Sequence, residues 1–294
     1  MSTTLVLGAT GRIGGPVAEL LLARGHRVRA GVRDPGSAAA ARLRAGGAEV
    51  VRADFDDVDA LAHAARGAAA VVAAGTAHRA GPDGERRHGE HVAEALARSG
   101  ARLVYVSGAG ADRATGVPVL ESKRAVERRI DELGVPATIL APAYFMENAF
   151  NPWNLAALAR GAYALPLDAD RALQQVAIAD LGAMAVLAVE RPAEVGRRVE
   201  IVSEELTGAQ AAERLTRVTG RPFAFERLPT DRLAPPLQRL FAWLDEVGFS
   251  IDVAALHSRH PEVGWHSFER WAAARRWRSP LALRGGREQG GEGG

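Results

Sequence analysis

The run Leu5-Val6-Leu7-Gly8-Ala9-Thr10-Gly11-Arg12-Ile13-Gly14 joins an apolar segment to a G-x-x-G-x-x-G turn, and residues 15–22 continue with the pattern of an amphipathic helix. A glycine that starts so tight a turn avoids Cβ crowding, and bare backbone at a helix N-terminus lets an anionic pyrophosphate approach free N–H groups. A glycine-rich turn without a ligand is the alternative, but a strand, this turn and a helix in succession favour a dinucleotide site. The residues expected to bind the dinucleotide here are Gly8, Thr10, Gly11, Arg12, Ile13 and Gly14.

The end of the second predicted strand, residues 27–33, indicates which dinucleotide binds. An Asp or Glu at this point would accept hydrogen bonds from the ribose 2′-hydroxyl of NAD and repel a 2′-phosphate. The chain has Arg33 there, and Arg12 is available from the glycine turn. Two guanidinium groups suit a phosphate dianion by charge and by forked geometry. Asp34 precedes Pro35 in a predicted turn and is interpreted as a loop residue, so the sequence favours NADP(H) as cofactor over NAD(H).

Composition narrows the class of protein. The chain has 294 residues, 47% of them hydrophobic and 24% charged, which is ordinary for a globular protein that buries a substantial core. The formal net charge of +2, with no basic stripe interleaved with aromatic residues, does not imply nucleic acid as a partner. The lack of cysteine excludes disulfides, thiolate catalysis and Cys-ligated metals. No signal peptide or membrane-spanning run is recognised, so we expect a cytoplasmic protein. A monomer or a homodimer is expected. The usage of Ala, Gly and Arg is typical of a high-GC bacterium.

Strand-like and helix-like segments alternate through the first half of the chain. Predicted strands cover residues 5–8, 27–33, 49–53, 69–73, 102–107 and 137–141, and predicted helices cover 13–24, 36–45, 58–65, 85–99 and 119–133. Continuously apolar strands between helices are typical of a parallel sheet covered on both faces by right-handed crossovers. The sequence therefore predicts the α/β class and a doubly wound parallel Rossmann sheet, with ligands beyond the carboxyl ends of its strands.

The second half is less regular and richer in proline and aromatic residues. Predicted strands cover residues 176–178, 198–202 and 223–228, and predicted helices cover 179–189, 207–219 and 236–247. We expect an NADP(H)-binding Rossmann domain at 1–150, and a smaller α+β substrate-side lobe at 151–283 with returning elements that pack on the sheet. Residues 284–294 are expected to form a disordered tail.

Further candidate residues follow the third and fourth strands. Asp54 and Phe55 are interpreted as an adenine pocket, and Asp56-Asp57 as caps of the next helix, although capping could account for the whole acidic run. Ala74, Gly75 and Thr76 are small enough for the backbone to pass close to the nicotinamide ribose and the pyrophosphate. His78 is placed to face a substrate, with a solvated loop as the alternative.

The pair His88 and His91 suggests a metal site, because positions i and i+3 share one helix face. The pair lacks the H-E-x-x-H spacing and has no obvious third ligand, so no metal is expected.

Ser107 closes the fifth predicted strand, and Lys123 lies in the next helix. The chain also contains Val32-Arg33-Asp34-Pro35, Asp54-Phe55-Asp56-Asp57, Ser122-Lys123-x-x-x-Glu127 and Ala141-Pro142-x-x-Phe145-Met146-Glu147-Asn148. With the glycine turn, these motifs resemble the NmrA-like family of atypical short-chain dehydrogenase/reductases over residues 3–275, and the F-M-E-N segment is the most specific. The resemblance implies a Rossmann fold with NADP(H) and a reductase or redox-sensing role.

The chain departs from conventional relatives at the expected acid. These enzymes use Tyr-x-x-x-Lys, in which the phenol protonates the substrate oxygen and the lysine holds the ribose. Val119 takes the tyrosine's place, four residues before Lys123, and Ala141 replaces the family's usual arginine before the proline. Lys123 is expected to bind the ribose or donate a proton. The alternative is a surface lysine paired with Glu127 at i+4.

Tyr144 is the phenol best placed to replace the missing one, with plain aromatic packing as the alternative. The candidate catalytic residues are therefore Lys123, Tyr144 and Ser107. Ser107, Lys123, Pro142, Tyr144 and Phe145 are also expected beside the cofactor. The candidate substrate pocket consists of His78, Tyr144, Met146, Asn148, Phe150, Trp153 and Trp243. Such a lining suits a small hydrophobic or aromatic substrate. The alternative is that these residues pack as core between the lobes.

These features favour an NADPH-dependent reductase that transfers hydride to a small hydrophobic or aromatic carbonyl, quinone, imine or enone. A second hypothesis is a non-catalytic NADP(H)-sensing regulator that acts through a protein partner, which the missing tyrosine would explain. A third keeps the cofactor but catalyses isomerisation or elimination.

Overall fold

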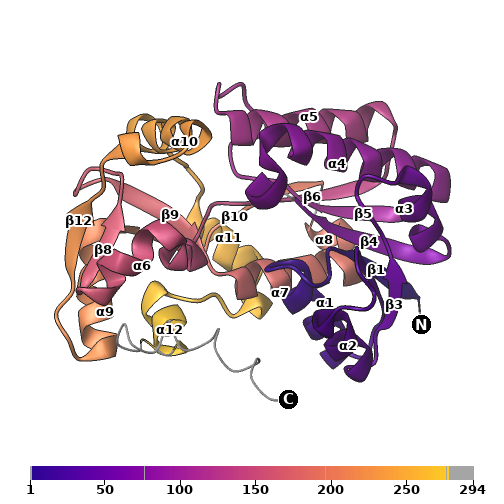
Figure 1. Cartoon of the computed structure of the whole chain (residues 1–294), viewed down its shortest axis with the longest axis horizontal. Coiled ribbons are helices and arrows are strands. Elements are labelled where there is room, and N and C mark those ends of the chain that lie inside the picture. The colour runs from indigo at the N-terminus through magenta and orange to yellow at the C-terminus, as the bar shows by residue number, and fades with distance from the viewer. Residues whose placement is uncertain (1, 76, 196, 276, 278–294) are drawn as a thin grey trace, which may run out of the picture.

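A computed structural model describes residues 2–75, 77–195, 197–275 and 277, arranged in two lobes (Figure 1). A seven-stranded sheet forms the centre of the larger lobe, with strand order β10-β6-β5-β4-β1-β2-β3 and only parallel pairs. Its strands are β1 (Thr3–Leu7), β2 (Arg27–Val32), β3 (Glu49–Arg52), β4 (Ala68–Ala74), β5 (Arg102–Val106), β6 (Ala137–Pro142) and β10 (Arg198–Ile201). The strand order reverses between β1 and β4, which is where such sheets bind ligands.

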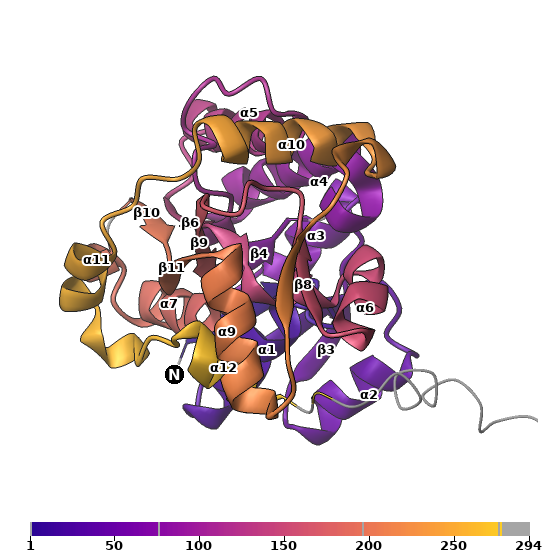
Figure 2. The same cartoon turned by 90° about the vertical axis from the view of Figure 1, so that its left-hand side faces the viewer.

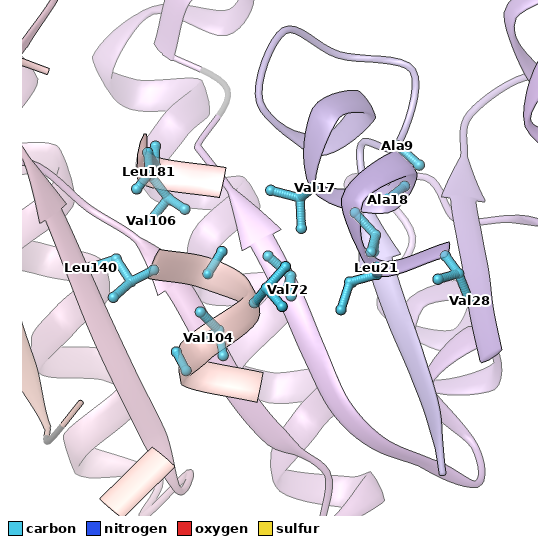
Figure 3. Close-up of a cluster of buried hydrophobic side chains, with 14 of the residues drawn as sticks. Ala9, Val17, Ala18, Leu21, Val28, Val72, Val104, Val106, Leu140 and Leu181 are labelled. Atoms are coloured by element: carbon cyan, nitrogen blue, oxygen red, sulfur yellow. The ribbon is translucent and has the colours of Figure 1, made fainter. Parts of the chain in front are cut away.

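Helices cover both faces of this sheet, because its strands are apolar on both sides. In β1, Val6 faces a core formed with α1 (Gly14–Ala23), α2 (Ala38–Ala45) and α7 (Ile178–Glu190), and Figure 3 shows part of that core. Leu5 and Leu7 face a second core formed with α3 (Val58–Ala65), α4 (Ala77–Ser99) and α5 (Pro118–Glu132). The predicted doubly wound Rossmann sheet is confirmed.

The smaller lobe surrounds a third core that contains most of the aromatic side chains. It holds a three-stranded sheet, β11-β9-β7, and a parallel pair, β12-β8. Its elements and those of the chain's C-terminal part are β7 (Tyr144–Phe145), η1 (Met146–Phe150), α6 (Pro152–Ala159), β8 (Ala162–Leu165), β9 (Ala172–Val176), α8 (Pro192–Val195), β11 (Glu204–Thr207), α9 (Gly208–Thr219), β12 (Ala224–Arg227), η2 (Thr230–Arg232), α10 (Pro235–Glu246), α11 (Val253–Arg259), η3 (Pro261–Val263) and α12 (Phe268–Ala273). The predicted smaller α+β lobe is therefore confirmed.

The chain passes between the lobes more than once. After β7 it forms α6, β8 and β9 in the smaller lobe, then returns as α7 and β10 to complete the larger one. α10 contacts α5 across the two lobes, as the views in Figures 1 and 2 agree. The division of the chain at residue 150 stays a prediction; η1, which ends at that residue, already packs in the third core through Met146.

Most predicted elements lie within a few residues of the observed ones, but the predicted strand at 176–178 is wrong. There β9 ends at Val176, and α7 begins at Ile178. The helix predicted at 85–99 is also longer, because α4 begins at Ala77 and breaks at Gly81, whose φ of 69° is not helical. The predicted tail at 284–294 lies outside the described residues. No helix in the described ranges is both long and apolar enough to cross a membrane.

Candidate cofactor and active site

The glycine turn after β1 provides a cradle that side chains would fill. Gly8 has a φ of +63°, and a Cβ on Gly14 would lie 2.4 Å from the Gly8 carbonyl oxygen. A Cβ on Gly11 would lie 3.0 Å from the same oxygen. No side chain caps the N-terminus of α1 and no acidic residue lies in its first turn, while Thr10 and Gly11 are exposed. This geometry fits an anionic pyrophosphate.

Two exposed arginines stand beside this cradle, on the loops after two adjacent strands. Arg12 belongs to the glycine turn and Arg33 follows β2. Neither guanidinium makes a hydrogen bond or ion pair with another residue of the described ranges. Asp34 accepts a hydrogen bond from the Gly36 backbone within its own turn, at 2.8 Å, as its interpretation as a loop residue requires.

The loop after β3 approaches the same turn. The Phe55 ring would lie 3.8 Å from a Cβ on Gly8, and it packs against His88 with ring centroids 5.6 Å apart. The Phe55 carbonyl lies 2.8 Å from His91 Nδ1. His88 and His91, the pair considered for a metal site, therefore both contact this loop. Asp57 caps α3 as predicted, through the Ala60 N–H.

Asp54 and Asp56 have different surroundings in that loop. The Asp54 carboxylate accepts a hydrogen bond from the Asp56 N–H at 3.2 Å and is half-buried. The prediction that Asp56 caps α3 is wrong, because its carboxylate pairs with Arg87 and His88, each at 3.1 Å. The hydrogen bond from Arg87, with a smaller contribution from His88, lowers the pKa of Asp56.

Lys123 lies at the carboxyl ends of β4 and β5, where the cofactor's nicotinamide half is expected. Its Nζ donates to Glu85 Oε1 at 2.7 Å, and Glu85 is only 1% exposed. The expected alternative, a surface pair between Lys123 and Glu127, is therefore wrong. Ala74 ends β4 and Gly75 follows it with an exposed backbone. Thr76 and the side chain of His78 lie outside the described residues.

Ser107, at the end of β5, donates its hydroxyl hydrogen to the Glu127 carboxylate of α5. Glu127 also pairs with Arg198 of β10 at 3.2 Å. Arg198 Nη2 in turn donates to the Gly108 carbonyl at 3.3 Å, so this network holds the loop after β5 in place. With its hydrogen engaged, the Ser107 hydroxyl could act toward a ligand only as a hydrogen-bond acceptor.

Tyr144 lies in β7 with its ring in the smaller lobe's core, where it packs edge-on against Phe241 at 5.8 Å. Its hydroxyl is buried and makes no hydrogen bond of acceptable geometry with the described residues. Burial raises the pKa of Tyr144 well above its usual value, and the adjacent Asn148 and Arg12 oppose this only in part. This placement favours packing over proton donation. Pro142 is buried at the end of β6, and Phe145 is half-buried in β7.

The remaining pocket candidates differ in their surroundings. Met146 is fully buried, and Phe150 packs against Trp277 at 5.1 Å, so both belong to the smaller lobe's core rather than to an open pocket. By contrast, Trp243 of α10 reaches the larger lobe, since a Cβ on Gly110 would lie 3.1 Å from its ring. The buried Trp153 Nε1 has no partner within the described ranges.

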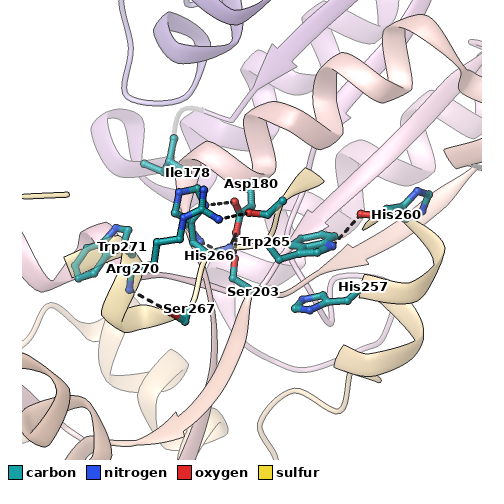
Figure 4. A network of polar contacts seen from close by, with 12 residues as sticks. Ile178, Asp180, Ser203, His257, His260, Trp265, His266, Ser267, Arg270 and Trp271 are labelled. Atoms are coloured by element: carbon teal, nitrogen blue, oxygen red, sulfur yellow. Dashed lines mark hydrogen bonds and ion pairs between the residues drawn. The ribbon is translucent and has the colours of Figure 1, made fainter. Parts of the chain in front are cut away.

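A second polar cluster joins α7 to the C-terminal segment (Figure 4). Ser203 donates to Asp180 at 2.5 Å, and His266 Nδ1 lies 2.5 Å from the other oxygen of the same carboxylate. The aspartate therefore separates the serine from the histidine, which is not the nucleophile–base order of a hydrolase triad. We interpret the cluster as structural.

Sequence reasoning missed two charged residues of this site, Glu85 and Arg198. It also missed the role of Glu127. Glu85 and Lys123 are 38 positions apart, and Glu127 and Arg198 are 71 apart. No local spacing rule could have paired them. The available signal was that the helices after the fourth and fifth predicted strands both follow the carboxyl edge of the predicted sheet.

Comparison with known proteins identifies the family to which the chain is similar. Residues 1–252 match the NmrA-like family. A Streptomyces griseus protein, (4-alkanoyl-5-oxo-2,5-dihydrofuran-3-yl)methyl phosphate reductase, is 33% identical over 234 residues, which are 77% of this chain and 77% of the relative.

Solved structures share the fold. Triphenylmethane reductase from Citrobacter sp., complexed with NADP(H), has a TM-score of 0.77 at 19% identity, covering 93% of this chain and 99% of that chain. NADPH-dependent quinone oxidoreductase from Escherichia coli, complexed with NADPH, has a TM-score of 0.76 at 21% identity, covering 92% and 99%. NmrA, a negative transcriptional regulator in complex with NADP, has a TM-score of 0.77 at 21% identity, covering 96% of each chain.

Proposed function

The chain belongs to the NmrA-like family, and on that premise we propose that it is an NADPH-dependent reductase that transfers hydride to a small conjugated acceptor. The observation that carries the cofactor assignment is the pair of exposed arginines, Arg12 and Arg33, beside the glycine cradle. A 2′-phosphate would give these two guanidinium groups a dianionic partner, with forked hydrogen-bonding geometry on each.

The state of the three candidate acids supports a particular kind of acceptor. Ser107 donates to Glu127, Lys123 is paired with Glu85, and the Tyr144 hydroxyl is buried. None is a free phenol of the Tyr-x-x-x-Lys type. We therefore propose that Ser107 and Lys123 bind and orient the ligands, that Tyr144 serves only in packing, and that water supplies the proton that balances the reaction. Such a site suits an acceptor that delocalises the incoming negative charge over a conjugated carbonyl.

Held at this edge by Arg12, Arg33 and Lys123, NADPH would supply a hydride from nicotinamide C4, and the acceptor would gain that hydrogen and two electrons while water gives the balancing proton. The name of the S. griseus relative describes a substrate of this kind, with a ring carbon–carbon double bond beside a ring carbonyl and an alkanoyl group. We place enones first among the candidate acceptors and quinones second. Carbonyls and imines without conjugation follow.

The test is NADPH oxidation by the purified protein with a panel of enones, quinones, imines and aromatic aldehydes. We expect at least one enone or quinone to be consumed. With NADPH deuterated at C4 on each face in turn, the product of a reduced enone should carry one carbon-bound deuterium from only one of the two labelled cofactors. Cofactor binding without oxidation across the whole panel would contradict the proposal. A product formed without net NADPH loss would instead indicate the isomerase alternative.

A regulator that senses NADP(H) is the second candidate, and the observation that favours it is Val119 in place of the tyrosine. This candidate predicts that NADPH changes the capture of a protein partner from a cell extract, while the panel stays unreacted. Turnover of any panel member at a rate above free NADPH would argue against it.

A further inference from the structure

Glu85 is a buried carboxylate that the reaction proposed above does not use. It lies in α4, four residues after the break at Gly81, and its side chain is 1% exposed. Its Oε1 lies 2.7 Å from Lys123 Nζ, and the lysine side chain is itself only 15% exposed. The pair thus joins α4 to α5 at the carboxyl edge of the sheet.

Two glycines show how closely the pair is held against the strand ends. A Cβ on Gly75, directly after β4, would lie 2.0 Å from Glu85 Oε1 and 2.7 Å from Lys123 Nζ. A Cβ on Gly108, just beyond β5, would lie 3.2 Å from Lys123 Cδ. The lysine stem therefore runs along the loop after β5, and its ammonium group ends over bare backbone after β4.

The helix start, Tyr105 and Glu127 surround the Glu85–Lys123 pair. The carboxylate lies near the start of the helix that resumes after Gly81, where the helix dipole favours negative charge. Burial raises the pKa of Tyr105 well above its usual value, and the negative charges of Glu85 and Glu127 raise it further. This phenol therefore stays neutral beside the pair. Glu127, one turn further along α5, is paired with Arg198 rather than with Lys123.

A buried ion pair contributes little net stability compared with apolar side chains of the same size, because both charges lose water. Its physical effect here is to fix one atom. An ammonium group has three N–H donors, and Glu85 takes one of them. With respect to the described residues, two donors remain at a fixed position over the exposed backbone of Gly75, at the edge where the nicotinamide ribose is expected.

We propose that Glu85 is the positioning residue for Lys123, holding its Nζ so that the two remaining donors bind hydroxyls of the nicotinamide ribose. This inference rests on the proposed NADPH-dependent function. Glu85 makes no contact with the cofactor itself in this arrangement. Without its carboxylate, Lys123 keeps its charge but loses its fixed place.

The test is a double-mutant cycle with NADPH affinity as the readout. Glu85→Gln keeps the shape and removes the charge, while Lys123→Met removes the donors. We expect each single variant to weaken NADPH binding about tenfold, the size expected for one charge-assisted hydrogen bond. In the Lys123→Met background, Glu85→Gln should change NADPH affinity less than twofold, because Glu85 acts through the lysine.

Unfolding in urea separates positioning from folding. A single variant leaves one buried charge unpaired and should lower stability, whereas the double variant should recover most of it yet stay weak for NADPH. If Glu85→Gln fails to fold, Glu85→Asp replaces it in the test. This variant keeps the charge on a shorter side chain and should bind NADPH with an affinity between those of the unaltered protein and Lys123→Met.

The outcomes are distinguishable from failure of the proposed function. If the unaltered protein does not bind NADPH, both proposals are overturned. If it binds NADPH but folded Glu85→Gln binds equally well, only the role of Glu85 is overturned. Equal fold-losses from Glu85→Gln in the presence and absence of Lys123 would overturn it as well, because the two residues would then act independently.

Discussion

At the glycine turn, the space around single Cα atoms decides whether a dinucleotide can approach. Gly8 adopts a positive φ, and Gly14 packs against the Gly8 carbonyl so closely that no side chain fits between them. These requirements are local to seven residues, so the sequence pattern carries them directly. The Lys123–Glu85 pair is different, because its geometry exists only after α4 and α5 have packed together.

Replacement of Gly14 by alanine should damage both the fold and the cofactor site. The new Cβ would lie 2.4 Å from the Gly8 oxygen, so the turn must shift. We expect a loss of about 1–3 kcal/mol in the free energy of unfolding, as for other overpacked sites, and at least about a tenfold weaker NADPH affinity.

Gly182→Ala in α7 is the matched control, because a Cβ there would meet no atom within 4 Å. It should leave NADPH affinity unchanged and stabilise the helix by up to about 1 kcal/mol. Equal effects of the two substitutions on NADPH affinity would show that the turn does not form the cofactor site.

Among the elements, β7 and η1 join the lobes through Glu147. This residue of the F-M-E-N segment accepts a hydrogen bond from the Ile178 N–H at the start of α7, at 3.1 Å. It also accepts bonds from Trp271 Nε1 at 2.9 Å and Arg275 at 2.6 Å. The most specific motif of the sequence is therefore, at this position, a structural link between the larger lobe and α12.

Glu147→Ala should lower the free energy of unfolding by about 3 kcal/mol, because it removes three hydrogen bonds and leaves buried donors unpaired. Glu213→Ala, on the exposed face of α9, should change it by less than about 0.5 kcal/mol. Urea unfolding measures both, and faster amide exchange in α12 should accompany only the first. A loss no larger than that of Glu213→Ala would contradict the proposed link.

The sequence allowed the larger lobe to be predicted nearly element by element, because its strands and helices have distinct periodicities. α9 was also predicted closely, since Thr207 and Gln210 form a capping box and Gly220 ends the helix. The short strands β8, β9 and β11 were missed, because four or five residues carry little periodicity and their pairing depends on distant partners. For the same reason, the sequence left open whether Met146 and Phe150 line a pocket or pack in the core, and the structure places both in the core.

At the scale of the whole molecule, both lobes contribute to the carboxyl edge of the sheet. Trp243 of α10 packs against the loop after β5, while the Asp180 cluster ties α7 to the C-terminal segment. The glycine cradle, Arg12, Arg33 and Lys123 all lie on loops or helices at that edge. From this arrangement we expect the edge to bind NADP(H) and to select it by its 2′-phosphate.

Equilibrium titration of the protein with NADPH and with NADH, followed by cofactor fluorescence, measures this selectivity. We predict that NADPH binds at least about tenfold more tightly, and that Arg33→Ala abolishes most of this preference while NADH affinity stays unchanged. Arg98→Ala, which removes an exposed arginine paired with Asp59, should leave both affinities unaltered. NADH affinity equal to or tighter than that of NADPH in the unaltered protein would contradict the account.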